Sequence, residues 1–137
     1  MSTSTDYPRS ICAGEAIGLM QAVVEESGRD HTYTARRFTD QVTGAEVACV
    51  LYVCQGEADC MFGRMLERFG VPCTRLSFIC HLPIQWALAR LSIICPPGLA
   101  HSLSVAQVLH DIGMAWGHVL DYFERACEDA ALRGVRM

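Results

Sequence analysis

Cys60 is the residue whose type and position first suggest chemistry. It follows a predicted strand and turn and stands at the predicted start of a helix, with Asp59 as candidate N-cap. Backbone N–H groups at a helix start stabilise a thiolate, and the chain has five histidines that could act as a base. Cys60 is therefore a candidate catalytic nucleophile. The alternative is packing, in which Cys60 and Gly63 let the helix lie close against the strand. We favour packing, because most free cysteines are buried and unreactive.

A His-Asp pair, His110–Asp111, stands near the end of a predicted helix. It resembles the metal-binding pair of HD-domain phosphohydrolases, and His81 lies upstream at a distance that fits the first histidine of that family. The resemblance implies His81, His110 and Asp111 as candidate metal ligands, and His110 and Asp111 as candidate catalytic residues. Met114 stands where that family normally has a lysine. The alternative is that Asp111 caps the next helix and His110 is a surface residue. We favour this alternative and expect no metal or other cofactor, because short motifs often match by chance.

The cysteines are a second possible source of metal ligands. There are eight of them, and no two are spaced as CxxC. A zinc ion could in principle be held by a cluster of Cys73, Cys80, His81, Cys95 and His101. Because the spacings match no common zinc motif, we expect most of the cysteines to be small core residues that stay reduced in a cytosolic chain.

Arginine pairs are candidates for binding phosphate. Arg64 and Arg68 are one helical turn apart and share a face, and Arg36 and Arg37 are adjacent. Guanidinium groups bind phosphate in bidentate geometry, so a nucleotide or other small molecule is a candidate ligand. The alternative is a solvated helix edge, paired with Glu67 or other nearby acids.

Trp116 stands within the sequence Gly113-x-x-Trp116-Gly117. The small neighbours allow a large ring to pack across a close helix approach. Trp116 could anchor a partner protein, but a buried structural role is favoured, and Gly113 is predicted to be structural as well.

The elements that position these residues are predicted to be mainly helical. Apolar side chains recur at helical spacing in six segments, namely 11–27, 59–69, 74–80, 84–94, a helix capped by Ser102 or Ser104, and a last helix from Trp116 to Gly134. Strands are predicted near 31–36 and 47–54, the second buried on both faces because its apolar run is nearly continuous. Residues 1–9 are predicted to be a disordered tail and residues 10–134 a single domain. The predicted class is helix-rich α+β, with five or six helices packed around a small β-hairpin or sheet.

Composition excludes several functions. The 137 residues suit one domain, and 51% hydrophobic against 19% charged residues exclude general disorder. A net charge of -4 argues against nucleic acid as a partner, and no apolar run is long enough to span a membrane. There is no lysine, which excludes a Schiff base and a GxxxxGK phosphate loop. Arginine and alanine are frequent while lysine and asparagine are absent, which indicates a GC-rich genome.

Two segments carry a resemblance to known sequences. Residues 52–72 contain a helix start of the form Cys-hydrophobic-hydrophobic-Gly, followed by Leu66 and Gly70-Val71. Residues 107–120 have the form Q-x-x-x-D-x-G-x-x-W-G-x-x-L. Together they are similar to small uncharacterised proteins of actinobacteria and their phages, over about a third of the chain. The resemblance implies a compact domain without an assigned catalytic residue, with Asp111-x-Gly113 at a junction between helices.

These observations favour a small cytosolic, non-enzymatic binding protein of phage or actinobacterial origin. We expect it to act by contact with a host protein or with a second copy of itself as a homodimer, and we expect no nucleic-acid or membrane partner. One alternative is an enzyme that uses Cys60 as nucleophile or a metal held by His81, His110 and Asp111. Another is a protein that sequesters a nucleotide or other small molecule through Arg64 and Arg68.

Overall fold

The computed structural model describes residues 9–34, 36–49, 52–54, 56–80 and 82–137, with the backbone alone for 36–38 and 46–49. The described residues form six helices, α1 (Ala13–Ser27), α2 (Met61–Phe69), α3 (Cys73–Leu76), α4 (Ile84–Arg90), α5 (Pro97–Asp111) and α6 (Trp116–Leu132). They also form six short strands, β1 (Arg9–Ser10), β2 (Arg36–Thr39), β3 (Glu46–Cys49), β4 (Val53–Cys54), β5 (Glu57–Ala58) and β6 (Ile93–Ile94). The predicted helix-rich α+β class is confirmed.

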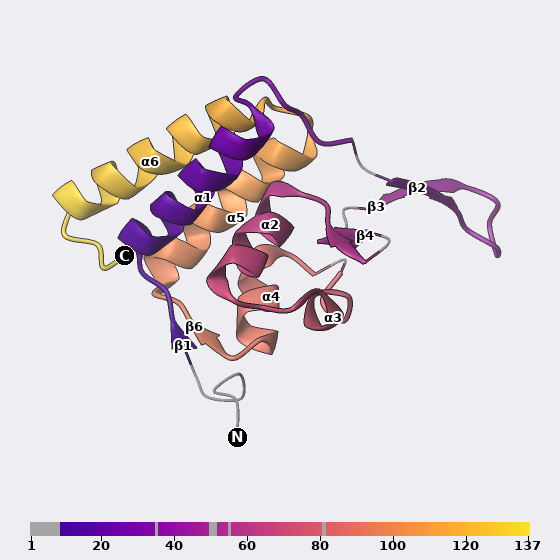
Figure 1. Cartoon of the computed structure of the whole chain (residues 1–137), viewed down its shortest axis with the longest axis horizontal. Coiled ribbons are helices and arrows are strands. Elements are labelled where there is room, and N and C mark those ends of the chain that lie inside the picture. Colours follow the sequence, from indigo (N-terminus) through magenta and orange to yellow (C-terminus); the bar gives the residue numbers. More distant parts are fainter. Residues whose placement is uncertain (1–8, 35, 50–51, 55, 81) are drawn as a thin grey trace.

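The long helices form the body of the molecule. A short turn joins α5 to α6, so the two helices pack as antiparallel neighbours. Helix α1 packs against both α6 and α2, and α4 packs against α5 (Figure 1). Each helix buries one face, as its apolar spacing requires. In α2 the residues predicted to face inward are all buried, namely Met61, Phe62, Met65, Leu66 and Phe69. The largest fully buried side chain of the core is that of Trp116.

The predicted second strand, 47–54, is divided in the structure. Its first part belongs to β3, which pairs antiparallel with β2, and its last part is β4, which pairs with β5. Residues 50 and 51 and the side chains of 46–49 lie outside the described part of the chain. The burial of both faces of this strand therefore stays a prediction. The hairpin β4–β5 lies beside α2 and α3. The hairpin β2–β3 instead extends away from the helices (Figure 1).

The parallel pair β1–β6 has no counterpart among the predicted elements. Arg9 pairs with Ile93 and Ser10 pairs with Ile94. The predicted helix 84–94 therefore ends early, at Arg90, and Ser92 adopts a positive φ of 61° before β6. Ser10 belongs to β1, and the N-cap of α1 is Cys12. Arg9 was predicted to lie in the disordered tail, but it is paired in β1. Residues 1–8 lie outside the described residues.

Helix α5 also begins earlier than predicted. Proline suits the first turn of a helix, and α5 starts at Pro97, which leaves Ser102 inside the helix as a buried residue. The segment that follows α6 packs back onto the fold beyond the predicted boundary at 134. The N–H of Ala13 donates to the carbonyl of Met137 at 2.9 Å. Among the described helices, none is both long and apolar enough to cross a lipid bilayer.

Candidate functional site

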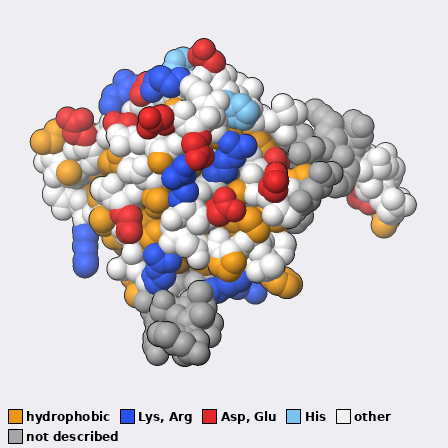
Figure 2. Space-filling model, viewed as in Figure 1, with side chains coloured by type: hydrophobic (Ala, Val, Ile, Leu, Met, Phe, Trp, Pro, Cys, Tyr) orange, Lys and Arg blue, Asp and Glu red, His pale blue; other side chains and the backbone are white. Residues whose placement is uncertain are grey.

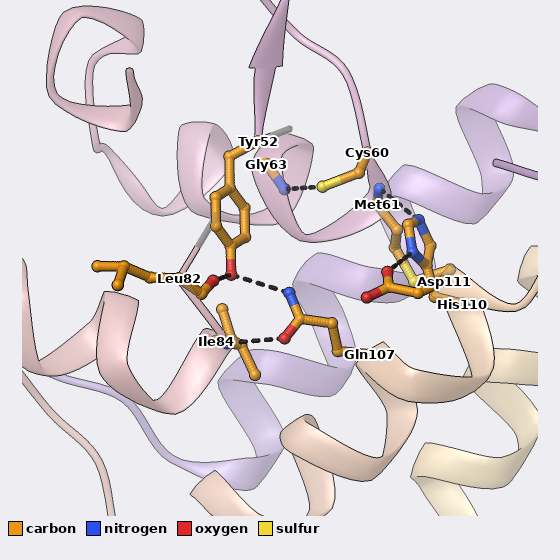
Figure 3. Close-up of polar contacts among 9 residues, drawn as sticks. All are labelled: Tyr52, Cys60, Met61, Gly63, Leu82, Ile84, Gln107, His110 and Asp111. Atoms are coloured by element: carbon orange, nitrogen blue, oxygen red, sulfur yellow. Dashed lines mark hydrogen bonds and ion pairs between the residues drawn. The ribbon is translucent and has the colours of Figure 1, made fainter. Parts of the chain in front are cut away.

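Cys60 lies inside the protein with no exposed surface. It is itself the N-cap of α2, in place of Asp59, and its Sγ accepts a hydrogen bond from the N–H of Gly63 at 3.2 Å (Figure 3). Burial raises the pKa of the Cys60 thiol to about 12, because the thiolate would lose its hydration, and the N–H groups of Gly63 and Phe62 offset this only in part. Cys60 is therefore a protonated thiol at neutral pH, which argues against the nucleophile interpretation.

Gly63 marks the close approach between α2 and the chain before β4. A Cβ built on Gly63 would lie 2.8 Å from the carbonyl carbon and 3.0 Å from the Cα of Tyr52, with the carbonyl oxygen nearer still. These are backbone atoms, so no rotamer change could relieve the contact. The packing interpretation of Cys60 and Gly63 agrees with this geometry, and the neighbouring backbone is that of Tyr52.

A buried polar network joins the same Tyr52 to two helices. The Tyr52 hydroxyl donates to the carbonyl of Leu82 at 2.5 Å and accepts from Nε2 of Gln107 at 2.8 Å (Figure 3). Oε1 of Gln107 in turn accepts from the N–H of Ile84 at 2.7 Å. Burial raises the pKa of Tyr52 well above its ordinary value. The network therefore fixes the chain before β4 to the start of α4 and the second half of α5.

His110 is fully buried, so the prediction that it is a surface residue is wrong. Its Nε2 accepts from the N–H of Met61 at 3.3 Å, and its Nδ1 lies 2.9 Å from Oδ1 of Asp111 (Figure 3). A backbone N–H can only donate, so Nε2 carries the lone pair and Nδ1 carries the proton that is donated to Asp111. Both ring nitrogens are engaged within the fold, which leaves neither free to bind a metal.

Aromatic rings surround His110 on several sides. Tyr33 stacks on the imidazole with ring centroids 4.9 Å apart, and Phe62 meets it edge-on at 5.4 Å. The Trp116 ring lies at 5.7 Å. His110 is therefore a core residue that joins the end of α5 to α2, and Asp111 orients its ring from the partly exposed side.

The candidate metal sites do not assemble in the described part of the chain. His81 lies outside the described residues, and no group of three or more His, Cys, Asp or Glu side chains among the described residues could hold a metal. Asp111 ends α5 and does not cap α6, whose N-cap is Ala115. The proposed Cys/His cluster is likewise dispersed, with Cys73, Cys80 and Cys95 packed against the core and His101 exposed on α5. No two of the described cysteines form a disulfide.

The guanidinium groups of α2 are used to hold α1. Nη1 of Arg64 donates to Oγ of Ser27 at 2.5 Å, and Arg68 forms an ion pair with Glu26. Arg68 therefore pairs with an acid of another helix and not with Glu67, and the printed partner of Arg64 is a serine hydroxyl. The side chains of Arg36 and Arg37 lie outside the described atoms. Any phosphate held by Arg64 and Arg68 would therefore compete with these contacts to α1.

Trp116 is buried and structural in its contacts. It begins α6, its N–H donates to the carbonyl of His31 at 2.8 Å, and the His31 ring meets it edge-on at 4.4 Å. Its Nε1 has no hydrogen-bond partner among the described residues. Gly113 adopts a φ of 98° in the turn between α5 and α6, at the predicted junction between helices. A partner protein could not contact the Trp116 ring without opening the core.

Two surface clefts are described, and neither reaches these buried groups. One, of about 910 Å³, lies between α5 and α6, and the other, of about 430 Å³, lies where β1 and α1 meet the start of α5. Neither is lined by Cys60 or His110. Sequence reasoning missed the α5–α6 cleft and the Tyr52–Gln107 network, because each depends on contacts between distant segments.

The fold and the buried polar groups define a helix-rich α+β protein whose Cys60 and His110 stabilise its core. Comparisons of the chain with protein-family models, with curated proteins and with solved structures find no match.

Proposed function

We propose that this chain is a small non-enzymatic binding protein that acts by contact with another protein, and that the hairpin β2–β3 makes this contact. The observation that carries the proposal is the hairpin itself, which extends from the helical body and is visible as a projection of the molecular surface (Figures 1 and 2). Its sheet has two strands in the described residues, so both outer edges are open there. A two-stranded hairpin gains stability by adding a strand, which a partner can supply.

Local hydrogen bonds build the turn of this hairpin. The N–H of Gly44 donates to the carbonyl of Asp40, and the N–H of Asp40 donates to the carbonyl of Ala45, each at 2.8 Å. Gly44 and Ala45 on one strand thus face Asp40 alone on the other. This arrangement is a β-bulge, and it requires the positive φ of 73° at Gly44. Oδ1 of Asp40 accepts from the N–H of Val42, and such bonds lower the pKa of Asp40. The hairpin is therefore preorganised before any partner binds.

The register shows which backbone groups a partner strand would meet. Because Asp40 and Ala45 are hydrogen-bonded to each other, the antiparallel alternation points the N–H groups of positions 37 and 39 away from β3. It likewise points those of positions 46 and 48 away from β2. At the tip, Val42 is 93% exposed. The projection thus offers backbone donors along its edges and an apolar side chain at its end.

The charge distribution on the surface favours a protein partner over a strongly charged one such as nucleic acid. Acidic and basic side chains are interspersed over the face shown in Figure 2, without an extended region of one sign. This supports the expectation that nucleic acid is not the partner. The free thiols of the described cysteines support a reducing compartment such as cytoplasm. The absence of lysine supports an origin in a GC-rich actinobacterium or its phage.

A second copy of the chain is the first partner to test. We expect light scattering to show a dimer at high micromolar concentration, formed by pairing of two hairpins. Proline at an outward-facing N–H removes the donor but leaves the inner ladder intact. Thr39→Pro therefore closes the β2 edge and Ala48→Pro closes the β3 edge. We expect one of these variants to raise the dissociation constant of the dimer by at least about tenfold. Along the paired edge, proline removes a backbone hydrogen bond and also disturbs the contact between the two strands. The other variant serves as a matched control.

A strictly monomeric chain would remove the homodimer from the proposal. Binding to a different protein is then tested with a photo-crosslinking amino acid in place of the exposed Val42, in cells that express the chain. The proposal expects a crosslinked protein that is lost with one of the two proline variants. If the chain is monomeric and neither variant changes the crosslinks, the hairpin is not a binding element and the proposal is wrong.

A further inference from the structure

The cleft between α5 and α6 has a volume of about 910 Å³, within the size range of small-molecule sites. It lies between the first half of α5 and the second half of α6, where Gly98 and Ser102 of α5 face Ala126 and Ala130 of α6. These side chains are small, and Ser102 and Ala130 are buried. The two helices therefore leave a hollow with a largely apolar floor between them.

The segment after α6 closes one end of this cleft. A Cβ on Gly98 would lie 2.7 Å from a methyl carbon of Val135 and 2.9 Å from the carbonyl oxygen of Arg136. Gly98 thus allows this segment to pack directly on α5. The cleft is bounded by helices on two sides and by the chain at one end, so its shape is set by the fold.

The charged side chains of the cleft are mostly basic. Arg125 of α6 and Arg133, the residue directly after α6, line it, as does His101 of α5. Arg125 has no ion pair among the described residues, and it is exposed. Arg133 is bonded to Asp129 at 2.9 Å, and Asp129 is the one acid of the lining. An exposed ion pair of this kind contributes little to stability and is readily exchanged for a ligand.

Tyr122 adds a half-buried aromatic ring to the same wall as Arg125. An aromatic ring next to an apolar floor favours a ligand with a flat or apolar body. A guanidinium that forms no ion pair with the described residues favours a carboxylate or a phosphate, which it binds in bidentate geometry.

We propose that the α5–α6 cleft binds a small organic anion, in which a carboxylate or phosphate group is held by Arg125 and Arg133 and an apolar body lies on the floor between the helices. This site goes beyond the proposed protein contact, because it involves neither β2 nor β3. The two proposals can therefore fail independently.

Four small probes separate the two parts of the ligand. Phenyl phosphate and benzoate carry both an anionic group and an apolar ring, inorganic phosphate carries the anion alone, and benzyl alcohol carries the ring alone. In calorimetric titrations at low salt, we expect phenyl phosphate or benzoate to bind more tightly than either single-feature probe. Equal binding of benzyl alcohol, equal binding of inorganic phosphate, or no binding of the two complete probes at millimolar concentration would each overturn the proposal.

Three substitutions of exposed residues test whether these side chains hold the anion: one should lower the affinity, one should raise it, and one should leave it unchanged. Arg125→Gln removes the unpaired guanidinium, so we expect the affinity for the better complete probe to fall by about tenfold or more. Asp129→Asn removes the repelling carboxylate and releases Arg133, so affinity should rise severalfold. Arg90→Gln changes an exposed arginine of α4 that does not line the cleft, and affinity should be unchanged. Weaker binding by Asp129→Asn, or an equal effect of Arg90→Gln and Arg125→Gln, would show that these side chains do not hold the anion.

Discussion

Replacing Gly63 with alanine places a methyl group against the backbone of Tyr52. The new Cβ would lie 2.8 Å from the carbonyl carbon and nearer still to the carbonyl oxygen, so α2 and this segment must separate by at least about 0.6 Å to reach the ordinary contact distance of 3.4 Å. Overpacking of this kind costs about 1 to 3 kcal/mol. The displacement also strains the hydrogen bonds that hold the Tyr52 hydroxyl, worth about 1 kcal/mol each. The higher helix propensity of alanine offsets about 0.5 to 1 kcal/mol of this loss in stability.

The net expectation for Gly63→Ala is a loss of about 2 to 4 kcal/mol in the free energy of unfolding. Urea denaturation followed by tryptophan fluorescence measures it, because Trp116 is fully buried. Gly18→Ala is the matched control, since a Cβ on Gly18 in the middle of α1 meets no atom within 4 Å. It should raise stability by about 0.5 to 1 kcal/mol. If Gly63→Ala is as stable as the wild type while Gly18→Ala behaves as expected, the close approach to Tyr52 does not constrain position 63.

Three further predictions concern the buried polar groups. The pKa of Cys60 is raised from 9.0 to about 12, so stability is fully present below about pH 9 and falls as pH rises toward 12, by about 1.4 kcal/mol per pH unit. Urea midpoints between pH 8 and 11 should therefore fall less steeply for Cys60→Ala than for the wild type, and equal slopes would contradict this. Tyr52→Phe leaves the Leu82 carbonyl and a donor of Gln107 unpaired, so chemical denaturation should show a loss of about 1 to 3 kcal/mol. His110→Phe keeps an aromatic ring but leaves the buried N–H of Met61 without its acceptor. It should lower the free energy of unfolding by a similar amount, about 1 to 3 kcal/mol. An unchanged urea midpoint would argue against that hydrogen bond.

The parts of the fold that were predictable from the sequence are those with a local cause. The spacing of Met61, Met65 and Phe69 repeats once per helical turn, and this alone predicts α2 and its buried face. The absence of a side chain at Gly63 likewise predicts a close approach, and the structure places the Tyr52 backbone there. Helix α6 has a similarly clear division between apolar and charged faces.

The parts that were not predictable depend on partners far away in the sequence. Ile93 and Ile94 continue the apolar pattern of α4, but pairing with β1 makes them a strand. His110 is a polar residue by type, and its burial depends on an acceptor role toward Met61 and on three neighbouring aromatic rings. Gln107 is buried because Tyr52 and Ile84 satisfy its side chain, and no local pattern indicates this.

The position of α1 between α2 and α6 has a consequence for synthesis on the ribosome (Figure 1). Helix α1 leaves the exit tunnel long before α6, because the four other helices lie between them in the chain. Until α6 emerges, α1 lacks one of the two helices against which it packs, although it carries side chains that are completely buried in the finished fold, such as Met20 and Val23. Strand β1 must likewise wait for β6. The core therefore closes late in translation, and a nascent chain stalled before α6 is the form in which chaperones would meet its apolar surfaces.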